Sequence, residues 1–198
     1  MVRSMSGRKR IMIIAGEASG DFHGANVVRE IRKKDAGIEV FGIGGKSMSS
    51  QGARIYMDSS RLAVVGITEV FSKIPNLVKG INTAKRMLRK LEPNLLILID
   101  FPDFNLHVAS VAKKLGIPIL YYISPQVWAW RSGRIKRIRK LVDHMAVILP
   151  FERNFYRKHG VSVSFVGHPL MDVAAPLRHT GKKEKSETGL SSPVIGLL

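Results

Sequence analysis

Residues 95–105 read LLILIDFPDFN, a run of five aliphatic residues followed by two carboxylates around a proline. Consecutive Leu and Ile residues are typical of a parallel strand that is buried on both faces. Pro102 cannot continue a paired strand, and it restricts Phe101 to an extended conformation, so we expect a stiff loop. Asp100 and Asp103 are therefore predicted to lie at the carboxyl end of a buried strand.

Similar apolar runs recur along the chain, separated by segments with helical periodicity. This alternation predicts an α/β fold, a Rossmann-like doubly wound parallel sheet with helices on both faces. The predicted strands are 11–15, 39–43, 95–100, 119–123, 145–149 and 163–166, and the predicted helices are 21–34, 104–115, 132–142 and 151–159. In such a sheet ligands bind where the loops converge at the carboxyl ends of the strands.

The composition narrows the class of protein. The chain has 198 residues, 45% of them hydrophobic, which suits one sizeable globular domain. A formal charge of +17 should attract polyanions, phosphorylated small molecules or an anionic membrane surface. The absence of cysteine excludes disulfides and thiolate chemistry and fits a reducing, cytoplasmic compartment. The apolar stretch 11–15 is too short for a signal peptide or a membrane span, so we expect neither.

Changes in composition predict the domain boundaries. Residues 1–10 form a basic N-terminal tail, and residues 11–178 contain all the predicted strands and helices. Residues 179–192 are rich in Gly, Lys, Glu, Ser and Thr, which is typical of a linker. The apolar residues 193–198 are expected to begin a second domain.

Two predicted loops carry acidic side chains. Asp100 is suited to accept a proton from a hydroxyl nucleophile, although it could instead satisfy backbone amides, and Asp103 could cap a helix that begins at Phe104. The other loop, AGEASGDFHG at 15–24, matches neither GxGxxG nor GxxxxGK[ST]. Its acids, Glu17 and Asp21, suit sugar hydroxyls better than phosphates, and the alternative is that Ser19 or Asp21 caps a helix.

Two further loops follow later strands. In SPQVWAWRSGR at 124–134, Gln126 falls at a strand end, whereas Trp128 and Trp130 could simply pack in the core. The segment RSGRIKRIRK at 131–140 holds six basic residues, either a solvated face or an attraction for an anionic substrate. His168, in FVGHPLMD, has no companion ligands at metal-binding spacing, so we expect no metal site.

Five of these stretches carry a family resemblance. GEASGD, IDFPDFN, SPQVWAW, LPFE and GHPL, in this order and spacing, resemble the lipid A disaccharide synthases, which are glycosyltransferases of Gram-negative bacteria. The resemblance runs from about Ile11 to Met171. It implies a two-domain glycosyltransferase B architecture of which this chain is the N-terminal, acceptor-side half. The donor-binding groups are then expected beyond Leu198, and the 198-residue chain is expected not to catalyse alone.

The resemblance also implies a reaction. Such enzymes transfer diacylglucosamine from UDP-2,3-diacylglucosamine to the 6-hydroxyl of 2,3-diacylglucosamine 1-phosphate, with inversion and release of UDP, and need no metal or other cofactor. It implies that Asp100 is the general base, and that the acceptor-site residues are Glu17, Ser19, Asp21, Asp103, Asn105, Gln126 and His168. The implied partners are the two glycolipid substrates and the inner face of the inner membrane, with a homodimer as a further option.

Residues 64–81 have two interpretations. Apolar side chains recur there at helical spacing, at Ile67, Val70, Phe71, Ile74, Leu77, Val78 and Ile81. Periodicity alone favours a core helix. A diacylated substrate favours a partly exposed surface that contacts acyl chains or membrane, flanked by cations such as Lys79 and Lys85.

Two rival functions share parts of this pattern. Another glycosyltransferase B enzyme or a sugar-nucleotide epimerase would share the architecture but lack a lipid-handling surface. A nucleic-acid-binding protein would explain the charge, but the sequence holds no known binding motif and its aromatic residues lie in apolar runs, so we expect no nucleic acid partner.

Overall fold

The computed structural model describes residues 8–62, 70–129 and 133–174. The chain divides into two compact units, Met1–Val166 and Gly167–Leu198. The first unit holds the whole sheet, and the described part of the second contains helix α7 (Leu170–Ala174). The predicted boundary at residue 178, the expected linker and the start of a second domain lie outside the described residues.

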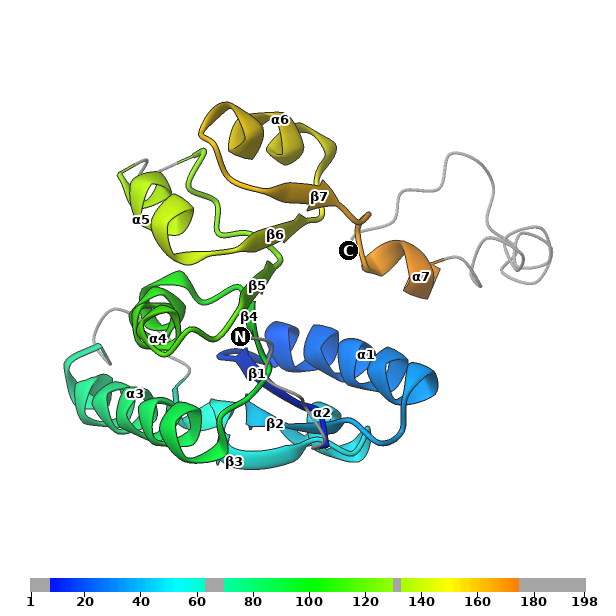
Figure 1. The fold of residues 1–198 in the computed structure, drawn as a ribbon, viewed down its shortest axis with the longest axis vertical. Helices are drawn as coiled ribbons and strands as arrows, with labels where there is room; N and C mark the ends of the chain where they lie inside the picture. The colour runs from blue at the N-terminus through cyan, green and yellow to red at the C-terminus, as the bar shows by residue number, and fades with distance from the viewer. Residues whose placement is uncertain (1–7, 63–69, 130–132, 175–198) are drawn as a thin grey trace, which may run out of the picture. The chain divides into compact units, whose positions relative to one another are not determined.

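The sheet has seven parallel strands in the order β3-β2-β1-β4-β5-β6-β7 (Figure 1). Their bounds are β1 (Arg10–Ala15), β2 (Glu39–Gly44), β3 (Arg54–Asp58), β4 (Leu95–Ile99), β5 (Ile119–Tyr122), β6 (His144–Val147) and β7 (Val163–Phe165). The predicted doubly wound parallel sheet is confirmed. Strand β3 was not among the predicted strands, because this edge strand, RIYMD, buries only Met57 and lacks the aliphatic run of a central strand.

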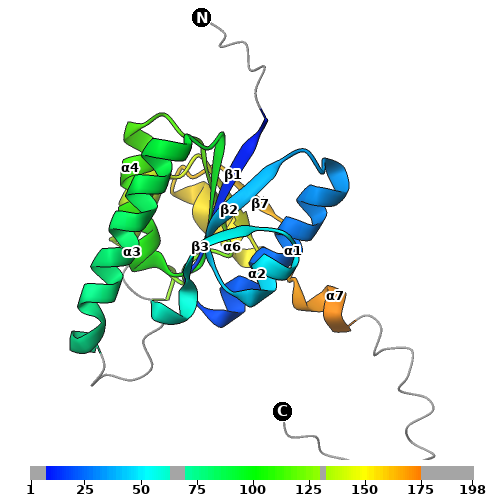
Figure 2. The ribbon, with the colours of Figure 1, turned by 90° about the horizontal axis from the view of Figure 1, so that it is seen from below.

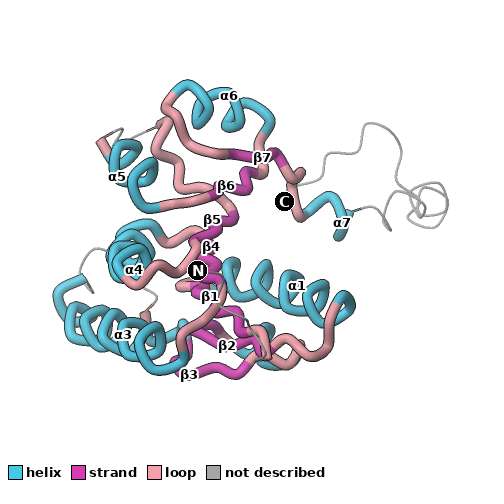
Figure 3. Tube along the Cα trace, viewed as in Figure 1, coloured by secondary structure: helices cyan, strands magenta, loops and turns pink. Residues whose placement is uncertain are grey.

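Helices cover both faces of this sheet (Figures 1, 2 and 3). One face packs against α3 (Val70–Leu91), α4 (Pro102–Lys114), α5 (Arg134–Leu141) and α6 (Pro150–Lys158). The other packs against α1 (Ala18–Lys34) and the short α2 (Lys46–Ser50). A 3₁₀ turn, η1 (Ser59–Arg61), follows β3. All four predicted helices are present, with ends that differ by up to three residues.

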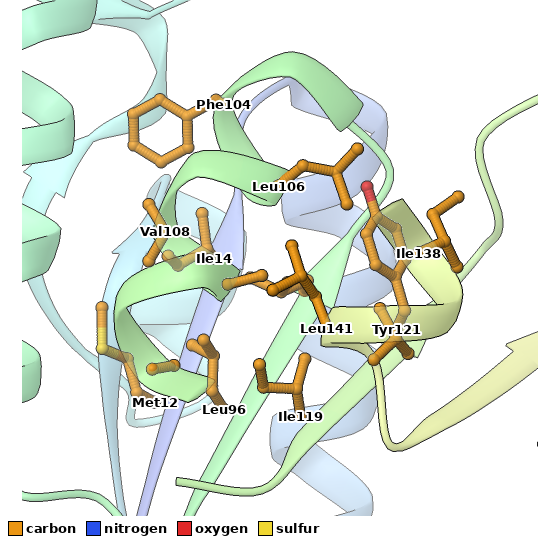
Figure 4. Packing of buried hydrophobic residues seen from close by; sticks show 14 of the residues in the cluster. Met12, Ile14, Leu96, Phe104, Leu106, Val108, Ile119, Tyr121, Ile138 and Leu141 are labelled. Atoms are coloured by element: carbon orange, nitrogen blue, oxygen red, sulfur yellow. The ribbon is translucent and has the colours of Figure 1, made fainter. Parts of the chain in front are cut away.

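The aliphatic runs are continuous because both faces of the central strands are buried. In β4, Leu96 and Leu98 point into the core beneath α3, α4 and α5, while Ile97 and Ile99 point into the core beneath α1. Figure 4 shows Leu96 between Met12 of β1 and Ile119 of β5. Each fully buried aliphatic side chain contributes about 1.5–3 kcal/mol of transfer free energy. This burial fixes the sheet edge from which the loops emerge.

Asp21 joins α1 to α2. Its side chain is buried, and its two carboxylate oxygens accept hydrogen bonds from the backbone N–H groups of Gly45 (2.6 Å), Ser47 (2.9 Å) and Met48 (3.2 Å). These amides lie at the start of α2, where helical partners are lacking. Asp21 therefore caps α2 from inside α1 and does not cap α1 itself, and its oxygens are directed to the backbone instead of a ligand.

We expect Asp21→Ala to lower the free energy of unfolding by about 1–3 kcal/mol, because it leaves buried amides without an acceptor. Glu17→Ala removes an exposed carboxylate from the same loop and should change stability by no more than about 0.5 kcal/mol. Urea unfolding of the two variants measures the difference. Equal effects would show that the cap on α2 contributes nothing.

Candidate active site

The sheet reverses its winding between β1 and β4. These neighbouring strands lead to helices on opposite faces, α1 after β1 and α4 after β4. Loops that diverge in this way leave a crevice at the carboxyl ends of the strands, where open α/β sheets bind ligands. Glu17 follows β1 and Asp100 follows β4, so the topology brings two of the predicted acids to this edge.

Asp100 leaves β4 in a left-handed backbone conformation. Its φ is 43°, and Phe101 follows with φ 48° and ψ 58°, so the extended conformation expected of Phe101 is wrong. Two buried donors hold this turn: the Tyr121 hydroxyl and the Asn105 side-chain amide each donate to the Asp100 carbonyl oxygen at 2.6 Å. These hydrogen bonds outweigh the local preference of a residue before proline.

Backbone strain is concentrated at this edge of the sheet. Of the four non-glycine residues with positive φ in the described ranges, Asp100, Phe101 and Ile123 lie here, after β4 and β5. Ile123 has φ 61°, a rare conformation for a β-branched residue. Such strain, which costs of order 1–3 kcal/mol per residue, clusters at functional sites because the surrounding fold must maintain it.

Gly16 allows the loop after β1 and the loop after β4 to approach each other. The Phe101 ring occupies the space where a side chain at position 16 would begin, so a Cβ there would overlap the ring. The ring also packs against Phe104 with a centroid separation of 5.6 Å. The glycine of the GEASGD motif is therefore required by packing, independently of any ligand.

Two carboxyl groups at this edge have raised pKa values. Burial raises the pKa of Asp100, and a hydrogen bond from the Phe101 backbone N–H offsets part of that shift. Glu17 is exposed to solvent overall, but partial burial of its carboxyl group raises its pKa, and the negative charge of Asp100 raises it further. A carboxylate with a raised pKa binds a proton more strongly and is a better general base.

Asp100 lines a cavity of about 270 Å³. Its walls come from the loops after β4, β5 and β6 and from the start of α5. They are formed by Asp100, Pro102, Ile123, Ser124, Pro125, Gln126, Val127, Arg134, Ile148, Leu149 and Glu152. The predicted residue Gln126 is thus brought together with Asp100, and its side chain is exposed.

Glu152 is a site residue that the sequence analysis did not single out. It is 2% exposed, and it accepts hydrogen bonds from the Ser124 hydroxyl (2.5 Å), the Trp128 indole N–H (3.3 Å) and the Leu149 backbone N–H (3.1 Å). These bonds tie the loop after β5 to the start of α6. A sequence signal for this role was available: Glu152 is the third residue of α6, three positions after the N-cap residue Leu149, where a glutamate typically forms a capping box.

Trp128 is not a core residue. Its side chain is 39% exposed and meets the Phe151 ring edge to face at a centroid separation of 4.9 Å. Core packing therefore does not explain this tryptophan, while Trp130 lies outside the described residues. The exposed aromatic pair stands beside the cavity, next to Glu152.

Three other predicted residues have different surroundings. Asn105 is buried and donates to the Ile99 and Asp100 carbonyls, so it supports the turn and does not face the cavity opening. Asp103 is exposed and pairs with Arg134, and because α4 already begins at Pro102 it is not the cap of that helix. Ser19 is exposed in the first turn of α1.

His168 belongs to the second unit. There the Leu170 backbone N–H donates to its ring Nδ1 at 3.3 Å.

The predicted lipid-contacting segment forms the start of α3. Leu77 is partly buried against the core and Val78 is 50% exposed, so contact of these residues with acyl chains or membrane stays a prediction. Ile67 lies outside the described residues, as do the side chains of Val70, Phe71 and Ile74. Among the helices described, none combines the length and apolar character needed to cross a membrane.

Comparisons with known proteins give one family. The family model described as Lipid-A-disaccharide synthetase matches residues 11–197. The lipid-A-disaccharide synthase of Geobacter metallireducens is 56% identical over 168 residues, 85% of this chain and 44% of the relative. That of Coxiella burnetii is 43% identical over 190 residues, 96% of this chain and 50% of the relative. The chain thus spans about half the length of these curated relatives.

Solved structures share the fold at low sequence identity. A UDP-GlcNAc 2-epimerase from Neisseria meningitidis bound to UDP-GlcNAc has a TM-score of 0.60 at 13% identity, over 91% of this chain and 53% of its own. A UGT transferase from Siraitia grosvenorii in complex with UDP has a TM-score of 0.53 at 12% identity, over 93% of this chain and 56% of its own. These similarities concern the fold alone.

The raised pKa of Asp100 predicts how stability depends on pH. The folded chain holds the Asp100 proton more tightly than the unfolded chain, so stability falls as the pH rises through the folded pKa. We expect Asp100→Asn to raise Tm at about pH 8, and the gain to shrink toward about pH 4, where the carboxyl group regains its proton. Thermal melts measure the change, and Asp35→Asn, which removes the same charge at an exposed site, is the control. A variant less stable than the parent at both pH values would contradict the assigned cost of ionisation.

Proposed function

The chain belongs to the lipid-A-disaccharide synthetase family, and on that premise we propose that it forms the acceptor-side half of a lipid A disaccharide synthase. The reaction condenses UDP-2,3-diacylglucosamine with 2,3-diacylglucosamine 1-phosphate. It yields the β-1,6-linked disaccharide 1-phosphate and UDP. A glycosyltransferase of this kind must remove a proton from the acceptor hydroxyl as that oxygen attacks the anomeric carbon.

The observation that supports this proposal most strongly is the placement of Asp100. Its carboxylate has a raised pKa, lines a cavity formed by the loops after β4, β5 and β6, and is held by a strained turn. These are the properties of a general base that must meet a hydroxyl group in a fixed geometry. In the proposal, Asp100 takes the 6-hydroxyl proton while the glycosidic bond to UDP breaks and the new bond forms with inversion.

The neighbouring groups have supporting roles. Gln126 offers an amide to sugar hydroxyls in the cavity, and Glu17 accepts hydrogen bonds from the opposite side of the switch point. Tyr121 and Asn105 act through the Asp100 backbone, so they are positioning residues. In the proposal Asp21 shapes the loop, because its carboxylate caps α2 through three backbone amides.

Asp100→Asn keeps the shape of the side chain and removes its basicity. In the protein as its gene encodes it, we expect the rate of disaccharide formation to fall by about 10²-fold or more, the usual range for loss of a general base. The assay separates the disaccharide from UDP and from any epimerised sugar nucleotide, and Asp35→Asn serves as the control. Near-normal turnover would remove Asp100 from the mechanism, and an epimer as the product would favour the epimerase alternative.

We further propose that α3 associates with the cytoplasmic face of the inner membrane. Val78 is half exposed, and a shallow hollow on the same helix is lined by Pro75, Val78, Lys79, Asn82, Thr83 and Arg86. A groove of about 370 Å³ between α3 and α4 is lined by Lys85, Arg89, His107, Ser110, Val111, Lys114 and Leu115. Apolar side chains among cations are suited to an interface with anionic lipids.

Removing three cations from this groove should weaken binding to anionic vesicles. The combined variant Lys85→Gln, Arg89→Gln and Lys114→Gln loses about 1 kcal/mol per charge at such a surface, so affinity should fall by roughly 10²-fold. The control removes the same charge from α5, through Lys136→Gln, Arg139→Gln and Lys140→Gln. Sedimentation with phosphatidylglycerol vesicles measures binding, and phosphatidylcholine vesicles give the baseline. If both variants lose the same affinity for anionic vesicles, net charge alone explains the binding, and α3 is not the membrane contact.

A further inference from the structure

Among the residues that the structure describes, one cation lines the cavity that holds Asp100. Arg134, the first residue of α5, lines that cavity and its side chain is 19% exposed. The carboxylate of Glu152 in the same wall already accepts hydrogen bonds from Ser124, Trp128 and Leu149. The cavity therefore presents an acid of raised pKa on one side and a largely buried guanidinium on another.

The pairing of Arg134 leaves it able to bind a second anion. Its Nη2 donates to the Asp103 carboxylate, whose side chain is 71% exposed. A guanidinium has five N–H donors, so one carboxylate oxygen does not exhaust it. An exposed carboxylate partner contributes little binding energy and can give way to an anion that arrives in the cavity. Arginine favours phosphate because its planar donors match two phosphate oxygens at once.

The volume of the cavity and the positive charge of α5 suit a sugar phosphate without its acyl chains. A cavity of about 270 Å³ is at the small end of ligand sites, with room for one sugar phosphate and not for a whole glycolipid. Helix α5 carries Arg134, Lys136, Arg137, Arg139 and Lys140, which give this wall a positive field. A hydroxyl must reach Asp100, so a phosphate bound by Arg134 would be carried at another position of the same sugar.

We infer that Arg134 recognises the phosphate monoester of the acceptor and makes the enzyme specific for a phosphorylated sugar. This inference rests on the proposed function, since it assumes that the sugar bound beside Asp100 is the acceptor. The alternative is that Arg134 only joins α5 to α4 through Asp103. Under that alternative, replacing Arg134 lowers the stability of the chain and changes the binding of phosphorylated and unphosphorylated sugars by the same factor.

The first test measures binding to the chain itself. Glucosamine 1-phosphate and glucosamine are titrated into the parent chain, Arg134→Gln, Arg134→Lys and Arg137→Gln, followed by NMR. Arg137 is the matched control because it is on the same helix, and its Nη2 donates to the Leu106 carbonyl of α4 outside the cavity lining. We expect Arg134→Gln to weaken the binding of glucosamine 1-phosphate by about 10- to 100-fold, the range for loss of a charge-assisted hydrogen bond. The affinity for glucosamine should not change. Arg137→Gln should alter neither, and Arg134→Lys should retain part of the affinity.

The second test measures specificity in catalysis. In the protein as encoded, kcat/KM is compared for the acceptor with and without its 1-phosphate. Arg134→Gln should lower kcat/KM for the phosphorylated acceptor mainly through KM, and should bring the two acceptors close to equality. An equal loss on both acceptors together with a lower Tm would overturn the inference in favour of a structural ion pair.

The two tests separate this inference from the proposed function. If the parent protein forms no disaccharide from either acceptor, the proposed function fails, and the binding experiment still decides the role of Arg134. If the parent chain binds glucosamine 1-phosphate no better than glucosamine, the phosphate assignment fails whatever the activity. The phosphate assignment also fails if Arg134→Gln prefers glucosamine 1-phosphate over glucosamine as strongly as the parent chain does.

Discussion

The geometry of the site depends on one carbonyl oxygen. The Tyr121 hydroxyl and the Asn105 amide both donate to the Asp100 carbonyl at 2.6 Å, and thereby hold two successive left-handed residues between β4 and α4. Neither donor touches the cavity, since both are buried beneath it. Because Tyr121 belongs to β5 and Asn105 to α4, the turn is fixed to the core from two directions.

The packing around that turn follows from the same constraint. A left-handed Phe101 projects its ring over Gly16, so the loops after β1 and β4 come into contact. This contact brings Glu17 close enough for the charge of Asp100 to raise its pKa. The chain accepts strain and repulsion here because the buried sheet and helices stabilise the fold elsewhere.

The charges of the site are arranged in separate roles. Burial keeps the pKa of Asp100 high, whereas the buried Glu152 accepts three hydrogen bonds and serves as a structural link. Arg134 contributes a cation to the same cavity from α5. A strongly basic chain thus places the proposed proton acceptor and the proposed anion site around one small cavity.

The sequence alone was enough to predict the parallel sheet, its six aliphatic strands, the loops at their carboxyl ends and the family, because buried strands and glycine-rich loops leave local patterns. It could not predict the role of each polar side chain. Asp21 and Asp100 both lie in loops after predicted strands. In the structure, however, the Asp21 carboxylate accepts hydrogen bonds from three amides at the start of α2, whereas Asp100 lines a cavity. Phe101 contradicts its local preference, and Arg134 and Glu152 join the site from later elements. These outcomes depend on partners 20 or more residues away, because hydrogen bonding and burial are settled by contacts that form only when the sheet assembles.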